Sequence, residues 1–173
     1  WLAENLKAQD LRVLDASWYL PGQNRDGRTE YDAQHIPGAV FFDIDDIADT
    51  DSDLPHMLPA PEKFSVEVRK LGLGDGNRIV VYDTTGASAA ARVWWMLRWV
   101  GFDNAALLDG GLEAWTDGDR TLSTDPASRP DLGVAIELPS FTPDFAPPPP
   151  ADLDAANIAE PRLVNRVEPE YPR

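Results

Sequence analysis

Within the first 125 residues, short apolar runs of strand length alternate with longer segments whose apolar side chains have helical spacing. The strand-like runs are residues 11–16, 38–42, 78–83 and 104–109. Strands separated by helices usually form a parallel sheet with helices on both faces, because each crossover must pass over one face of the sheet. The sequence therefore predicts an α/β fold.

The two clearest helical segments are residues 61–71 and 87–100. In the second segment, Val93, Leu97 and Val100 form one apolar stripe, and tryptophans at positions 94, 95 and 99 widen it. We therefore expect this helix to be buried over much of its circumference.

Proline and tryptophan divide the chain. Five of the 16 prolines lie in residues 1–125 and eleven in residues 126–173, whereas all six tryptophans lie at or before Trp115. Tryptophan supplies large buried area, and proline locks φ and removes a backbone donor. We expect a packed domain over residues 1–125 and an extended proline-rich linker over 126–150. Residues 151–173 are too few to bury a core alone.

Acidic side chains dominate, with 30 Asp and Glu against 15 Lys and Arg and a formal net charge of -15. Nucleic acid is an unsuitable partner for such a chain, because phosphate backbones are bound by clustered cations. The apolar stretches are interrupted by arginine well before the roughly 18 residues that a membrane span requires. The acidity favours solubility, and we expect a cytoplasmic protein with no membrane partner.

The chain contains no cysteine and two histidines, His35 and His56. Disulfides, thiolate metal sites and thiol nucleophiles are thereby excluded from this sequence. Aspartates at positions 49, 51 and 53 imitate the start of a calcium-binding loop, but Leu54 replaces its glycine and Ala60 its bidentate glutamate. We expect a solvated acidic loop here, with no metal and no cofactor.

The loop that leaves the third predicted strand, residues 83–86, is the candidate ligand site, because ligands of parallel sheets bind beyond the carboxyl ends of strands. Backbone N–H groups and the dipole of the following helix would favour an anion there. No phosphate-binding glycine motif is present. Asp83 could act as a phosphate-accepting nucleophile, or it could simply accept hydrogen bonds from its own turn and cap the helix.

A hydrolase could in principle combine His56 and Asp45 with a serine, but no G-x-S-x-G motif is present. His35, in the segment HIPGAV, is better explained as a partly buried loop residue held by hydrogen bonds.

Several segments occur together in a distinctive order: VLDASWYLPG, HIPGAVFFDID, LPHMLP, RIVVYD, ARVWWMLRWVG and LLDGGLEAW. Over residues 1 to about 122 they resemble the amino-terminal domain of the two-domain rhodanese family, the thiosulfate and 3-mercaptopyruvate sulfurtransferases. The resemblance implies a rhodanese-like parallel sheet, followed by a linker and a second, similar domain.

In that family, a cysteine of the second domain accepts sulfane sulfur as a persulfide held by backbone amides, and passes it to cyanide or a thiol. Asp83 aligns with the position of that cysteine. The resemblance thus implies a sulfurtransferase with a small-molecule sulfur donor and acceptor, of which this chain is a non-catalytic part with no catalytic residue of its own. The missing second rhodanese domain is the expected partner. The alternative is a catalytically silent scaffold or partner-binding module.

The resemblance also implies roles for three further residues. Asp45, in FFDID, and His56, in HML, correspond to interface residues that relay a proton beside the catalytic loop, although His56 could equally just pin its own loop. Residues 151–173 resemble the start of a second domain, cut short. Arg173, in EPEYPR, then corresponds to an arginine that holds the substrate.

Overall fold

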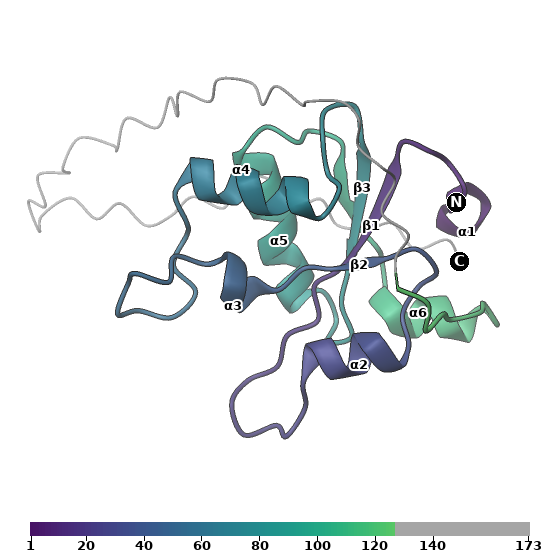
Figure 1. Ribbon diagram of the computed structural model, residues 1–173. Helices are drawn as coiled ribbons and strands as arrows, with labels where there is room; N and C mark the ends of the chain where they lie inside the picture. Colours follow the sequence, from purple (N-terminus) through teal and green to yellow (C-terminus); the bar gives the residue numbers. More distant parts are fainter. Residues whose placement is uncertain (127–173) are drawn as a thin grey trace, which may run out of the picture. The chain divides into compact units, whose positions relative to one another are not determined.

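Four short strands form one parallel sheet in residues 1–126, the part of the chain that the structure, a computed structural model, describes (Figure 1). The strands are β1 (Leu11–Asp15), β2 (Val40–Phe41), β3 (Arg78–Tyr82) and β4 (Ala105–Leu107). Their spatial order is β2-β1-β3-β4, and every neighbouring pair is parallel. The predicted α/β sheet is confirmed, although β2 and β4 are shorter than predicted.

Helices cover both faces of this sheet. They are α1 (Leu2–Asn5), α2 (Gly27–Ala33), α3 (Ile44–Ile47), α4 (Pro61–Lys70), α5 (Ser88–Trp99) and α6 (Gly111–Asp117). Figure 1 shows α3, α4 and α5 on one side of the sheet and α1, α2 and α6 on the other. Helices α4 and α5 match the two predicted helical segments.

Each face of the sheet has its own apolar core, because successive side chains of a strand point to opposite faces. Leu14 and Val81 pack with α3, α4 and α5, whereas Val13 and Val80 pack with α1, α2 and α6. Trp95 of α5 is half-exposed, so the expectation that this helix is buried over much of its circumference is only partly met. The helix is amphipathic, with its buried face against the sheet.

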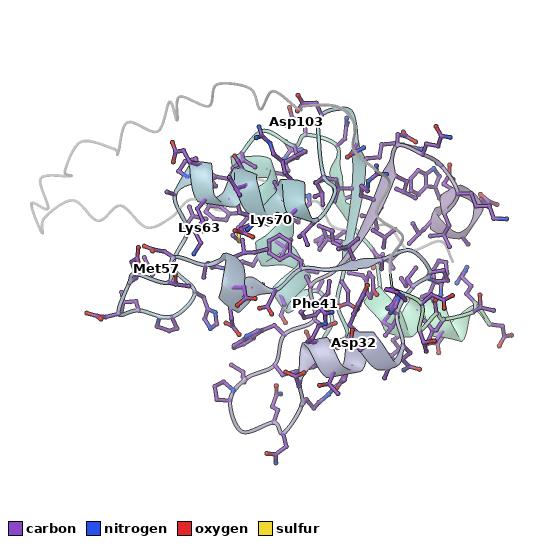
Figure 2. The ribbon with its side chains drawn as sticks, viewed as in Figure 1. Asp32, Phe41, Met57, Lys63, Lys70 and Asp103 are labelled. Carbon is purple, nitrogen blue, oxygen red and sulfur yellow. The ribbon has the colours of Figure 1, made fainter. Side chains whose placement is uncertain are left out.

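The loop between α3 and α4 is fastened at both of its ends. Lys63 of α4 donates a hydrogen bond to the carbonyl of Ala48 (2.6 Å), and the Asp49 N–H donates to the carbonyl of Met57 (2.8 Å). Figure 2 shows Met57 on this loop and Lys63 on the neighbouring helix. The same loop carries His56, whose position the site depends on.

No helix among residues 1–126 is long and apolar enough to span a bilayer. The predicted domain over 151–173, with Arg173, lies outside the described residues, as does the predicted linker apart from Pro126.

Candidate functional site

The loop between β3 and α5 is organised around the buried carboxylate of Asp83. Asp83 Oδ1 accepts hydrogen bonds from the N–H groups of Thr85 and Ala87, both at 2.9 Å. Oδ2 accepts from the N–H groups of Ala89 (3.0 Å) and Ala90 (2.9 Å) in the first turn of α5. The anion at this helix N-terminus is therefore the side chain of Asp83 itself, and the capping interpretation is confirmed.

Helix α6 fixes the backbone of the same residue. The Leu112 N–H donates to the carbonyl of Asp83 (3.0 Å), and Gly111 approaches so closely that a Cβ there would lie 2.4 Å from that carbonyl oxygen. Gly111 also has a φ of +56°, which favours glycine. The LLDGG segment thus locks the Asp83 loop from the side opposite α5.

Asp45 and His56, predicted to act together, lie next to each other. His56 Nδ1 is 3.0 Å from Asp45 Oδ1, but this approach lacks hydrogen-bond geometry, and Nδ1 has no hydrogen-bond partner among residues 1–126. Trp18 touches both residues: its indole N–H donates to Asp45 Oδ2 (3.0 Å), and its ring meets the His56 ring edge-on at 4.8 Å. The pair is therefore positioned for an ionic contact whenever the imidazole is protonated.

The backbone of His56 is held by Arg92 of α5. Arg92 donates from a terminal nitrogen to the His56 carbonyl, while its Nε is buried and has no partner within the described residues. His56 itself has a φ of +55°, a conformation uncommon for a residue with a side chain. The contact supports the interpretation that His56 pins its loop. It uses the backbone carbonyl of His56 and does not involve the imidazole ring.

A cavity of about 400 Å³, here called the His56 cavity, opens beside this pair. Its walls come from the loop after β1, from α3, from His56 and from the start of α5. They are formed by Trp18, Leu20, Gln23, Ile44, His56, Thr85, Ser88, Ala89 and Arg92.

A second cavity of about 440 Å³, here called the Asp15 cavity, lies at the ends of β1 and β3 against α2 and α6. It is lined by Asp15, Ser17, Arg25, Glu30, Tyr31, Ala33, Gln34, Thr84, Leu112, Glu113 and Thr116. Sequence reasoning did not predict this cavity. The one available signal was that β1, like β3, is followed closely by polar residues at its carboxyl end.

Asp15 and Ser17 are both almost fully buried. The Ser17 N–H donates to Asp15 Oδ1 (2.9 Å), and burial raises the pKa of Asp15 above its usual range. The Ser17 hydroxyl oxygen is buried and lacks a hydrogen-bond partner among the residues described.

A polar network closes the other wall of the Asp15 cavity. Arg25 donates two hydrogen bonds to Glu30, at 2.7 and 2.6 Å, and these lower the pKa of Glu30. Tyr19 donates to the same carboxylate (2.6 Å) and contacts the hydroxyl of Thr84. Burial raises the pKa of Tyr19, so its hydroxyl stays protonated and able to donate.

His35 lines neither of these two cavities. It is fully buried and stacks on Tyr31 with ring centroids 4.1 Å apart. Its Nδ1 lies 2.7 Å from the carbonyl of Tyr31, and its Nε2 lies 3.0 Å from the carbonyl of Asp125. His35 thus holds residues 123–125 against α2, which confirms that it is fixed by hydrogen bonds. Across residues 1–126, no three His, Asp or Glu side chains converge as metal ligands would.

A parallel sheet with a tight loop between a central strand and the helix that follows it defines an α/β domain with its candidate site at the carboxyl ends of the strands. The family model described as "Rhodanese-like domain" matches residues 1–117. The chain belongs to the rhodanese family.

Its relatives are sulfurtransferases. Human 3-mercaptopyruvate sulfurtransferase is 47% identical over 148 residues, which cover 82% of this chain and 50% of that protein. The mitochondrial thiosulfate/3-mercaptopyruvate sulfurtransferase 1 of Arabidopsis thaliana is 49% identical over 139 residues, covering 75% of this chain and 37% of that protein. The chain therefore spans half or less of the length of these relatives.

A crystal structure of the 3-mercaptopyruvate sulfotransferase from Escherichia coli has the same fold. It superimposes with a TM-score of 0.71 at 41% identity, covering 79% of this chain and 53% of that one.

Proposed function

We propose that this chain is the non-catalytic, amino-terminal part of a sulfurtransferase that moves sulfane sulfur from thiosulfate or 3-mercaptopyruvate to cyanide or a thiol. The transfer runs through a cysteine persulfide on a second rhodanese domain. The relatives support the reaction class, because they are sulfurtransferases of which this chain matches 37% and 50% of the length.

The Asp83 loop is the observation that carries the proposal. Its four inward N–H groups are all occupied by the Asp83 carboxylate, so the loop can neither bond to sulfur nor cradle a persulfide. A carboxylate lacks the nucleophilic sulfur that accepts a sulfane atom. This chain alone therefore transfers no sulfur.

The His56 cavity is the face offered to the second domain. Leu20, Leu54 and Met57 are exposed apolar residues in or next to the segments that form this cavity. Apolar groups gathered on one surface are typical of a site covered by a partner. Arg173 remains a candidate for binding the substrate from the second domain.

His56 and Asp45 can deliver a proton at the face offered to the second domain. When the C–S bond of 3-mercaptopyruvate breaks and sulfur passes to a thiolate, the carbon fragment retains the electron pair of the bond and needs a proton to become pyruvate. An imidazolium held by Asp45 can supply that proton from the His56 cavity.

The test measures thiocyanate formation from cyanide with either donor. We expect no turnover from the 173-residue chain and turnover from the complete encoded protein. In the complete protein, His56→Gln should lower kcat with 3-mercaptopyruvate by about a hundredfold, the usual size of a proton-transfer contribution. Glu62→Gln, an exposed acid of α4, is the matched control and should leave kcat unchanged.

Turnover by the 173-residue chain would refute the proposal. A complete encoded protein without a cysteine-bearing second domain would also refute it, and would favour the scaffold or partner-binding alternative.

A further inference from the structure

The Asp15 cavity is a second candidate site, separate from the His56 cavity and independent of sulfur transfer. Its volume of about 440 Å³ suits a small molecule. The two cavities share no lining residue. Ser17 and Thr84 line the Asp15 cavity, whereas their chain neighbours Trp18 and Thr85 line the His56 cavity.

The charges of the residues that line the Asp15 cavity indicate which ligands it favours. Three of its lining residues are acids, Asp15, Glu30 and Glu113, and the one base that lines it is Arg25. Arg25 is already engaged by Glu30 through two hydrogen bonds and lies over the Tyr19 ring, 4.0 Å from its centroid. The charges of Asp15 and Glu113 remain uncompensated by this arginine, so the cavity favours a cation.

The buried end of the cavity is formed by two polar side chains, Asp15 and Ser17. Asp15 is 2% exposed and Ser17 is 3% exposed. The Ser17 hydroxyl oxygen, as noted, has no hydrogen-bond partner within residues 1–126. A buried hydroxyl without a partner costs free energy, and so does ionising the buried Asp15 carboxyl, which has the Ser17 N–H and the Tyr82 hydroxyl as neighbours. A ligand that donates to both removes both costs.

We propose that the Asp15 cavity binds a small molecule through a primary ammonium group, which donates hydrogen bonds to the Asp15 carboxylate and the Ser17 hydroxyl. A primary ammonium carries three N–H donors on one compact atom, so it can serve both acceptors at once. Tyr31 and Leu112, which are buried apolar residues of the lining, contact the aliphatic part of the ligand.

The probe is n-propylammonium chloride, titrated into the 173-residue chain and followed by backbone amide NMR. We expect saturable shifts at the amides of Ser17 and Thr84, and unshifted amides at His56 and Ser88 of the other cavity. Two matched compounds separate the contribution of the positive charge from that of the N–H donors. Neutral 1-propanol keeps the size without the charge, and tetramethylammonium keeps the charge without an N–H donor. Both should bind at least about tenfold more weakly.

Variants test the two acceptors separately. Asp15→Asn keeps an acceptor for the Ser17 N–H but removes the charge, and should weaken propylammonium binding about tenfold or more. Ser17→Ala should weaken it about threefold. Glu62→Gln removes one distant exposed charge and should change nothing.

Two results would overturn the inference. One is tetramethylammonium shifting the same amides as strongly as propylammonium, which would indicate general attraction to an acidic protein. The other is propylammonium binding that survives both Asp15→Asn and Ser17→Ala in variants whose amide spectra show the native fold. Neither result bears on the sulfurtransferase proposal, because the probe contains no sulfur and the assay measures no turnover.

Discussion

The Asp15 and His56 cavities lie at the same edge of the sheet, yet their linings have opposite character. The Asp15 cavity contains three acids, one base and a buried hydroxyl. The His56 cavity contains no acid among its lining residues and is formed by Trp18, Leu20 and Ile44 together with His56 and Arg92. One is built to hold a polar ligand, and the other offers an apolar surface with a proton-transfer group at its rim.

The difference arises at two pairs of neighbouring residues just beyond β1 and β3. Ser17 and Thr84 line one cavity, whereas the residues that follow them, Trp18 and Thr85, line the other. Two short segments therefore build two chemically distinct sites. The wall that they share is the loop that Asp83 organises.

Removing the Asp83 carboxylate should damage both cavities and have the largest effect. In Asp83→Ala, four buried or partly buried N–H groups lose their acceptor. We expect the free energy of unfolding to fall by about 3 kcal/mol, because bonds to a charged acceptor are the strong ones. Urea denaturation measures this. Asp53→Ala, at an exposed loop position, is the control and should change stability by less than about 0.5 kcal/mol. An equal loss in both variants would contradict the role given to Asp83.

A methyl group at Gly27 should damage the Asp15 cavity most directly. A Cβ there would lie 2.1 Å from the carbonyl oxygen of Ser17, which forces the segment after β1 to move. We expect Gly27→Ala to cost about 2 kcal/mol and to abolish propylammonium binding. The amide shift of His56 should change less than that of Ser17, because His56 lies outside this segment and meets it through the ring of Trp18.

Gly22→Ala is the matched control for Gly27→Ala. Gly22 has a φ of +95°, and a Cβ added there would meet no atom within 4 Å, so this change adds backbone strain without a clash. It should cost about 1 kcal/mol and leave propylammonium binding intact. If Gly22→Ala also abolished binding, the effect of Gly27→Ala could not be assigned to the contact with Ser17.

The sheet and two helices were predictable because their sequences carry strong local signals. Residues 78–82 are almost entirely β-branched or aromatic, and α4 begins at a proline and buries Phe64 and Val68 one turn apart. Helix α2 was missed because it starts at a glycine and buries only Tyr31. Its real start signal is the side chain of Asp26, which accepts from the Thr29 N–H (2.7 Å).

The candidate site also has features that local sequence patterns predict and features that they do not. Capping by Asp83 follows from an aspartate at a strand-to-helix turn, which is a local pattern. The approach of Asp45 to His56 joins two segments that no periodicity connects. The residue types alone suggested the pair only within a hydrolase that lacked its motif, and the family resemblance placed the two residues together. The Asp15 cavity was not predicted. The polar residues after β1 are only a weak signal, because the cavity depends on the spacing of α2 and α6 from the ends of β1 and β3.

The smallest effect is expected from the charge of Asp15, and it depends on pH. Burial raises the pKa of Asp15 in the folded chain above its unfolded value, so the folded state holds the proton to higher pH. As pH rises through that window, the folded state binds more protons than the unfolded state, and stability is lost. Asp15→Asn removes the titrating carboxyl, so the variant does not lose stability in this way.

We therefore expect the stability of Asp15→Asn, measured relative to the original chain by urea denaturation, to increase as the pH rises above about 4 and to level off once the folded carboxyl has ionised. Glu62→Gln should show no such trend, since Glu62 is exposed. Saturating propylammonium should flatten the trend by stabilising the ionised carboxylate of the original chain. If the stability difference between Asp15→Asn and the original chain did not change with pH in the absence of ligand, water would reach Asp15 freely. The contrast between a buried acid in one cavity and none in the other would then no longer hold.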